Sequence, residues 1–324
     1  MIFDIKSKKS AVFRLKPNQV LKLLLLVAVL LLLFWQISDL KIETALFAAL
    51  LNTLSSNLVY FLAAVALLFL NYFFEVFKWF LLANHLEPKN FRESTIDVLK
   101  GLKLGLLTPL MIGDFLGRSL SFKKENKTAA MGSNLFNSIC QTYSTLFFGF
   151  LSILFWWLIS EDKFKNFLFI PVLIFGISTV LGLFFVFKFR ISWSFLWKWS
   201  FFKPYINSSK TTLGFDNKLR MTILLLSLAR TMVFNIQFLL FYISFGIQLP
   251  FLIIFIGVNL TLLIKTISGG LNVFGDLTIR EFVSINFFGM YHVDVRIILV
   301  VTFVVWFINI FLPVLIGFFI KPKL

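Results

Sequence analysis

The chain is poor in the residues that most enzymes use for polar chemistry. Its 324 residues include one cysteine and two histidines, and its 15 acidic residues face 31 basic ones. The lone Cys140 excludes an intramolecular disulfide and a metal site built from several cysteines. His85 and His292 stand alone in the sequence. We therefore expect neither a bound metal nor a cofactor.

Recognisable catalytic motifs are also absent. The sequence has no glycine-rich phosphate loop ending in Gly-Lys-Ser/Thr, no His-Glu-x-x-His, and no paired aspartates like those of metal-dependent sugar transferases. Its longest polar connection is about thirty residues, which is too short to fold alone. The sequence thus gives no positive sign of an enzyme, and residues 1–324 are expected to form a single integral membrane domain.

Long apolar runs dominate what is present. The chain is 59% hydrophobic and 14% charged, with a mean hydropathy of +0.91. Several runs approach the length needed to cross a bilayer, and they are continuous rather than alternating, which favours helices over a barrel. The net charge of +16 lies mainly at the ends of these runs, as in cytoplasmic loops beside anionic lipid. The sequence predicts an all-α polytopic membrane protein that does not bind nucleic acid.

The charges between the runs predict a topology. Basic residues precede the first run and follow the last, so both termini are expected in the cytoplasm of a cell that holds this protein in its (inner) membrane. The segments Phe91–Leu120 and Pro250–Ile279 are broken by proline or glycine and are expected to be re-entrant helix pairs, although Pro250–Ile267 is apolar and long enough to cross. The basic, tryptophan-rich Lys188–Arg220 is expected at the cytoplasmic surface. The six predicted full spans are Leu23–Trp35, Leu58–Leu82, Ala130–Ile159, Phe167–Phe187, Arg220–Ser244 and Ile297–Ile320.

A short acid-base motif occurs twice. Gly-Asp-x-x-x-Arg is found at Gly113–Arg118 and again at Gly275–Arg280, 162 residues later, which is half the chain. Composition alone would give about 0.01 such matches, so duplication is the better explanation. The span Leu58–Leu82 corresponds by the same offset to Arg220–Ser244, which should run in the opposite direction. The sequence therefore predicts inverted repeats over residues 57–159 and 219–321.

The candidate site residues are charges in apolar surroundings. A charged side chain at membrane depth costs several kcal/mol unless it is paired or hydrated, so the duplicated Asp and Arg indicate a functional site. Four residues separate Asp from Arg in each copy, so a self-satisfied structural pair is the alternative. The predicted substrate-binding residues are Asp114, Arg118, Asp276, Arg280, Glu281, Lys103, Lys265 and Arg230. The predicted helix breaks are Pro109, Gly113, Gly269, Gly270 and Gly275.

Three lysines in these regions have a simpler interpretation. Lys103 and Lys265 precede the two breaks at equivalent positions, and anchoring at the membrane surface accounts for them as well as a functional role does. Glu75 and Lys78 near the end of the second span are expected to form a local pair close to the membrane interface.

At the two copies of the acid-base motif, the chain resembles a flippase-like family, the transmembrane region of lysylphosphatidylglycerol synthases. The family's Pro-x-x-x-Gly-Glu-x-x-x-Arg is similar to Pro109–Arg118, with Asp114 in place of Glu. Its Gly-Gly-Leu-Gly-x-Arg-Glu is similar to Gly275–Glu281, with Asp276 and Thr278 in place of glycines. The helix after the first motif reads Asn134-Leu135-Phe136-Asn137-Ser138, where the family often has Arg and Asp.

The resemblance implies movement of a polar lipid headgroup between leaflets. Arg118 and Arg280 would then bind the phosphate, and Asp114, Asp276 and Glu281 would receive a cationic headgroup or a coupling proton. The family's bifunctional members carry an aminoacyl-transferring cytoplasmic domain that this chain lacks, so a separate lipid-modifying enzyme would be its partner.

Two other functions remain open. One is an integral-membrane transferase that acts on a lipid carrier, for which Glu281, His292 and Asp294 are the nearest approach to an acid and histidine cluster. The other is a noncatalytic partner in envelope lipid or glycan biosynthesis.

Overall fold

A computed structural model describes residues 44–106, 108, 112–188, 215–268 and 273–319, and the regular elements among them are all helices. The chain divides into two compact units, residues 1–51 and 52–324. Of the first unit, the structure describes only residues 44–51, which belong to α2 (Thr44–Ser56). The predicted span Leu23–Trp35 and most of Lys188–Arg220 lie outside the described residues. The fold given below is that of the second unit.

Five described segments are long and apolar enough to cross a membrane, which confirms a helical membrane protein. Each begins and ends within a few residues of a predicted span. Their ends are set by polar loops, as when Asp216 caps α10 by accepting from the Leu219 amide. The segments are α3 (Leu58–Asn84), α6 (Lys127–Ile159), α7 (Asp162–Phe187), α10 (Asn217–Ser244), and the run of α13 (Val295–Trp306), η4 (Phe307–Phe311) and α14 (Leu312–Phe319).

Helix α7 shows why these segments belong in lipid. It packs mainly against α6 and leaves much of its length uncovered. Large apolar side chains such as Phe167, Ile170 and Val180 are exposed along it. A soluble protein would rarely leave such a continuous apolar face in water, whereas a bilayer solvates it.

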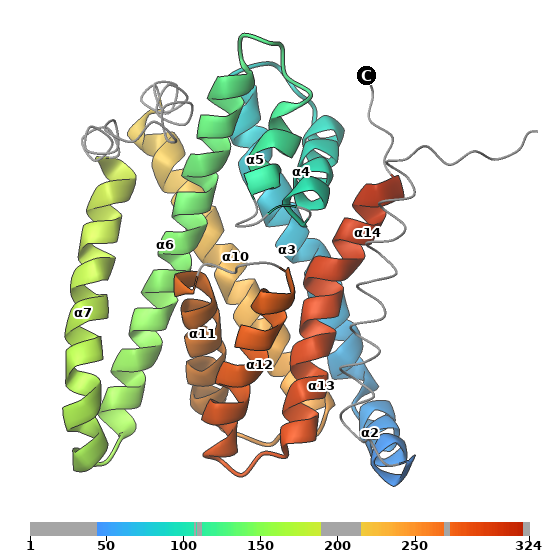
Figure 1. Cartoon of the computed structure of the whole chain (residues 1–324), viewed down its shortest axis with the longest axis vertical. Coiled ribbons are helices and arrows are strands. Elements are labelled where there is room, and N and C mark those ends of the chain that lie inside the picture. The colour runs from blue at the N-terminus through green and yellow to red at the C-terminus, as the bar shows by residue number, and fades with distance from the viewer. Residues whose placement is uncertain (1–43, 107, 109–111, 189–214, 269–272, 320–324) are drawn as a thin grey trace, which may run out of the picture. The chain divides into compact units, whose positions relative to one another are not determined.

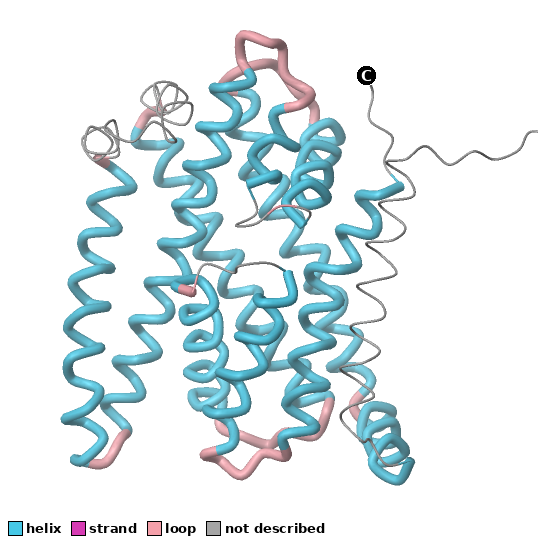
Figure 2. The backbone as a smooth tube through the Cα atoms, viewed as in Figure 1, coloured by secondary structure: helices cyan, strands magenta, loops and turns pink. Residues whose placement is uncertain are grey.

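Two shorter helix pairs are broken where the sequence predicted. The first pair is α4 (Phe91–Leu106) with α5 (Ile112–Ser119), and the second is α11 (Phe251–Ile267) with α12 (Val273–Gly289). In Figure 1 the two pairs lie in opposite halves of the second unit, with α4–α5 near one end of the long helices and α11–α12 near the other. Figure 2 shows that the facing ends of α4 and α5, and those of α11 and α12, lie toward the middle of the second unit, whereas the described loops between the other helices lie at its two ends.

The predicted end of the second pair is wrong. It was placed at Ile279, but α12 continues to Gly289. Residues 280–288 contain no proline and no glycine, so nothing in them interrupts the helical hydrogen bonds. The chain turns only after Gly289, where His292 adopts a left-handed φ of 57°.

The last span contains a π-helical turn, η4, that is tied to α3. Pro313 has no N–H to offer the carbonyl of Asn309 four residues earlier. The Tyr72 hydroxyl donates to that carbonyl at 2.8 Å. This bond fixes η4 against the helix that carries Glu75.

Candidate functional site

Glu75 lies at the centre of a buried ion cluster assembled from three helices. Its carboxylate is 2.8 Å from Arg118 Nη2 on α5, 2.7 Å from Arg230 Nη1 on α10 and 3.1 Å from Lys78 Nζ on its own helix. Asp114 joins the group through Arg118 Nε at 3.0 Å. We call these five residues the Glu75 cluster.

The Glu75 carboxylate has its full complement of donors. Oε1 accepts from Arg118 and from the Asn137 amide at 2.9 Å, and Oε2 accepts from Arg230 and Lys78. An ionised carboxylate offers about four lone-pair positions, so all are used. The arrangement holds Glu75 as an anion although the side chain is only 5% exposed.

Arg118 joins both acids of the cluster and still has one unused donor. Its Nε donates to Asp114 and its Nη2 contacts Glu75, while Asp114 Oδ2 accepts from Asn134 at 2.8 Å. Among the described residues, Arg118 Nη1 is buried without a hydrogen-bond partner. A buried donor without an acceptor is costly, so this atom marks a place for a further acceptor.

Arg230 forms the open edge of the cluster. It lies about midway along α10, with Nε donating to Asn71 at 2.8 Å and Nη1 to Glu75. Its side chain is 18% exposed, against 4% for Arg118 and none for Lys78. Of the three cations in the cluster, Arg230 is therefore the one that an approaching anion can contact.

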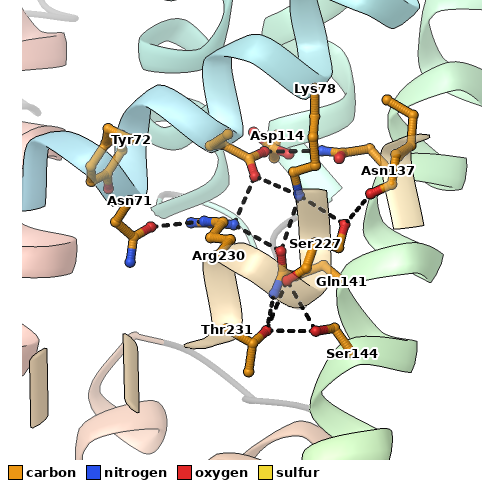
Figure 3. Close-up of polar contacts among 12 residues, drawn as sticks. Asn71, Tyr72, Lys78, Asp114, Asn137, Gln141, Ser144, Ser227, Arg230 and Thr231 are labelled. Atoms are coloured by element: carbon orange, nitrogen blue, oxygen red, sulfur yellow. Dashed lines mark hydrogen bonds and ion pairs between the residues drawn. The ribbon is translucent and has the colours of Figure 1, made fainter. Parts of the chain in front are cut away.

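A network of uncharged polar side chains extends the cluster along α6 and α10 (Figure 3). Lys78 donates to Gln141 at 3.0 Å and to Ser227 at 3.2 Å. Gln141 and Ser144 both donate to the Thr231 hydroxyl, at 3.0 and 2.7 Å. Together with the contact to Glu75, these bonds give each N–H of Lys78 an acceptor and join α3, α6 and α10 around it.

The second motif builds a smaller cluster on α11 and α12, composed of Lys265, Asp276 and Arg280. Asp276 is 3.1 Å from Lys265 Nζ and 2.9 Å from Arg280 Nε. Lys265 lies in the last turn of α11 and Asp276 in the first turn of α12, where the helix dipoles favour these charges. The Lys265 side chain is 29% exposed, and Arg230 is close enough to act on it electrostatically. We call this group the Lys265 cluster.

The structure brings together most of the predicted site residues, but as two groups. Asp114, Arg118 and Arg230 lie in the Glu75 cluster, and Lys265, Asp276 and Arg280 form the Lys265 cluster. Glu281 is buried beside Arg280 in sequence. Lys103 Nζ instead lies 5.2 Å from the centre of the Phe318 ring, where α4 packs on α14.

The predicted helix breaks have mixed outcomes. Pro109, Gly269 and Gly270 lie outside the described residues. Gly113 is in α5, where a Cβ would come within 2.1 Å of the Leu104 carbonyl oxygen, so close backbone packing requires it. Gly275 lies inside α12 rather than at a break.

Glu75 and Lys78 correct the sequence interpretation. They do form a local pair, but it is buried within the helix bundle and bound by residues of other helices, instead of standing alone at an interface. Asn134 and Asn137, where the resembled family often has charges, bind the two acids.

A spacing signal for the missed residues was present in the sequence. Polar side chains recur every three or four positions along three apolar spans, which places each set on one helix face. The three sets are Asn71, Glu75 and Lys78 on α3; Asn134, Asn137, Gln141 and Ser144 on α6; and Ser227, Thr231 and Asn235 on α10, where Arg230 precedes Thr231.

Within the described part of the chain, no group of three or more histidine, cysteine or acidic side chains could hold a metal ion. The clusters instead present cations suited to an anion. No protein-family model, curated protein or solved structure matches this chain, so the resemblance rests on its two short motifs alone.

Proposed function

We propose that this protein is a transporter that moves the anionic headgroup of a membrane lipid from one leaflet to the other. The observation that carries the proposal is the pair of partly exposed cations, Arg230 and Lys265, each at the edge of a buried cluster inside a bundle of apolar helices. Neither cation is fully enclosed by its acid partner, so each can contact a ligand.

The charge of the Glu75 cluster favours an anion. This cluster holds three cations and two carboxylates. Excess positive charge inside a membrane is costly, and an anionic ligand would offset it. The planar donor fork of arginine suits phosphate oxygens in particular.

The proposal includes the topology expected from the sequence. Leu23–Trp35 would complete six full spans, and the two helix pairs would enter from opposite faces as inverted repeats, with both termini in the cytoplasm. The opposite placement of α4–α5 and α11–α12 within the second unit supports this arrangement (Figure 1). A substrate site near the middle of the membrane, between repeats, is the usual design of such transporters.

The transferase alternative has less support. Asp294, one of its three candidate residues, caps α13 by accepting from the Arg296 amide and also pairs with the Arg296 guanidinium at 2.7 Å. This acid is engaged in holding a helix end.

A lipid-accessibility assay tests the proposal. Purified protein would be reconstituted into liposomes that carry fluorescent phosphatidylglycerol or a fluorescent polyprenyl phosphate, with fluorescent lysylphosphatidylglycerol, whose net charge is positive, as the comparison. Dithionite quenching from outside reports movement of label from the inner leaflet. We expect faster quenching of at least one anionic lipid than in protein-free liposomes.

Two arginine variants sharpen this assay. Arg230→Gln should slow movement at least about tenfold, the effect of losing roughly 1.4 kcal/mol of binding. Arg296→Gln makes the same chemical change outside both clusters and should move lipid at the wild-type rate. If wild-type protein moves no anionic lipid faster than empty liposomes do, the proposal is wrong.

A further inference from the structure

The strongest unexplained feature is that both arginines of the Glu75 cluster point their donors at one carboxylate. Arg118 and Arg230 come from different helices, α5 and α10, yet they meet at the two oxygens of Glu75 with distances of 2.8 and 2.7 Å. A phosphate group offers oxygens of the same charge and similar spacing. Glu75 therefore occupies the donors that an anionic headgroup would need.

We propose that Glu75 is an internal counter-anion which the phosphate of the headgroup displaces, and which then accepts a proton, so that one proton is bound with each headgroup. This inference rests on the proposed transport of an anionic lipid, and it adds how the site is coupled to protons. It assigns to Glu75 a role that neither sequence motif contains.

Two details of the cluster show how displacement would begin. Arg230 is the exposed edge, so an entering phosphate would contact it before the buried Arg118. Arg118 Nη1 has no partner among the described residues, so a ligand oxygen there would gain a hydrogen bond without breaking one. Displacement can therefore start before the Glu75 contacts are lost.

Once a phosphate takes the two arginine contacts, the negative charge of Glu75 would be too weakly compensated. It would keep Lys78 at 3.1 Å and Asn137 at 2.9 Å, but a phosphate anion would now lie beside it. Two neighbouring anions in a site of low dielectric repel strongly, and protonation of the carboxylate removes the repulsion. One O–H bond forms on Glu75, and the proton comes from a hydronium ion or buffer acid in the aqueous phase.

Neighbouring groups are less suited to take this proton. Lys78 already carries its proton as an ammonium that donates to Gln141 and Ser227, so it cannot accept another. Asp114 keeps the Nε edge of Arg118 and the Asn134 amide, which a phosphate at the other edge would not displace.

Two further titratable groups on helices that pack against α3, Asp97 and Arg220, are bound by residues outside the Glu75 cluster. Asp97 of α4 contacts Lys89 and Ser121, and Arg220 of α10 donates to two backbone carbonyls. The groups that act on Glu75 or on its neighbours are Tyr72 and Lys78 on α3, Asp114 and Arg118 on α5, Cys140 on α6 and Arg230 on α10. Asp97 on α4 contacts Trp79 instead, and Arg220 on α10 lies over the Phe136 ring.

Calorimetry can count the proton directly. Dihexanoyl phosphatidylglycerol would be titrated into the purified full-length protein at pH 7, once in PIPES and once in imidazole, which differ in ionisation enthalpy. This probe is a phosphodiester that does not titrate near pH 7, so any proton bound belongs to the protein. We expect about one proton taken up per lipid bound, and an affinity that weakens about tenfold for each unit of rising pH.

Two glutamate variants locate the proton. Glu75→Gln should bind the lipid with proton uptake near zero and with an affinity that no longer depends on pH. Glu161→Gln changes an exposed glutamate between α6 and α7 and should keep the wild-type count. If Glu75→Gln does not fold, the wild-type count decides alone, because a value near zero overturns the inference.

The outcomes separate this inference from the proposed function. Lipid binding without proton uptake overturns the role of Glu75 and leaves lipid transport standing. Undiminished proton uptake in a folded Glu75→Gln variant also overturns it. Absence of binding overturns the inference, and absence of binding together with absence of lipid movement in liposomes overturns both.

Discussion

Arg118 illustrates what a single side chain contributes and how much of it the sequence could predict. Its pairing with Asp114 follows from a spacing of four residues on one helix, which the sequence predicted as one of two alternatives. Its contact with Glu75 joins positions 43 residues apart on different helices, and the contact of Arg230 with Glu75 joins positions 155 apart. Periodicity places residues on a face but does not say which faces meet, so the sequence could not predict this convergence.

Replacement of Arg118 should destabilise the protein. Arg118→Gln leaves Asp114 without its cation and removes one of three cations from Glu75, and loss of one partner of a buried pair costs about 3 to 5 kcal/mol. Thermal unfolding in detergent should show a lower Tm. Addition of Asp114→Asn to Arg118→Gln should recover part of the loss, because the stranded charge is then gone. A double variant no more stable than Arg118→Gln would contradict the pairing.

The cap of α13 gives a pH-dependent contribution to stability. Hydrogen bonds from Arg296 hold the pKa of the Asp294 carboxyl below its ordinary value of 3.8. The folded state therefore binds fewer protons than the unfolded state, so the contribution is present above pH 3.8 and is lost as pH falls through the folded pKa. Both side chains are more than a third exposed, so it should stay below about 1 kcal/mol.

The measurement is a comparison of wild type with Asp294→Asn across pH. The difference in Tm should be largest near pH 7 and should shrink toward pH 3. A difference that does not change with pH would show that the charge of Asp294 contributes nothing.

At the scale of elements, glycine controls how closely α4 and α5 approach. A Cβ on Gly117 would lie 2.6 Å from the Gly101 Cα and 2.6 Å from the Lys100 carbonyl oxygen, both of which are backbone atoms. A Cβ on Gly101 would meet Asp114 Oδ1 at 2.3 Å. Close contact of these helices therefore sets the position of Asp114 and Arg118.

Gly117→Ala should force the pair apart. Overpacking of this kind typically costs about 1 to 3 kcal/mol, and here it should also disturb the Arg118 contact with Glu75. Gly289→Ala makes the same change at the end of α12, where a Cβ meets nothing within 4 Å, and should leave Tm unchanged. Equal Tm values for the two variants would argue against this packing.

The sequence predicted that both helix pairs are interrupted, but it did not predict where the second pair ends. Proline and glycine within apolar runs are strong local signals, so the interruption before Ile112 and the one before Val273 were expected. The end of α12 carried no such signal until Gly289. The sequence did not predict the π-helical turn, because the turn also involves the Asn309 carbonyl accepting from Tyr72, which lies 237 residues earlier.

At the scale of the whole molecule, the proposed topology makes an independent prediction. Glu125 precedes α6 and Glu161 follows it, and both are exposed. Because one apolar helix separates them, cysteines at these positions should react with an impermeant thiol reagent from opposite sides, Glu125→Cys from the cytoplasm and Glu161→Cys from outside. Cys140→Ser provides the background. Labelling of both from one side would contradict a spanning α6.

The charge of the Glu75 cluster has a consequence for the energetics of the transport cycle. The empty cluster carries one excess positive charge. A monoanionic headgroup that arrives with a proton on Glu75 leaves this total unchanged, so loaded and empty forms would respond equally to a membrane potential, which otherwise contributes about 2.3 kcal/mol per charge per 100 mV. Wild-type lipid movement should then be indifferent to a potassium diffusion potential set with valinomycin and should respond to a pH gradient. With Gln at position 75 that balance is broken, and voltage should begin to drive the cycle.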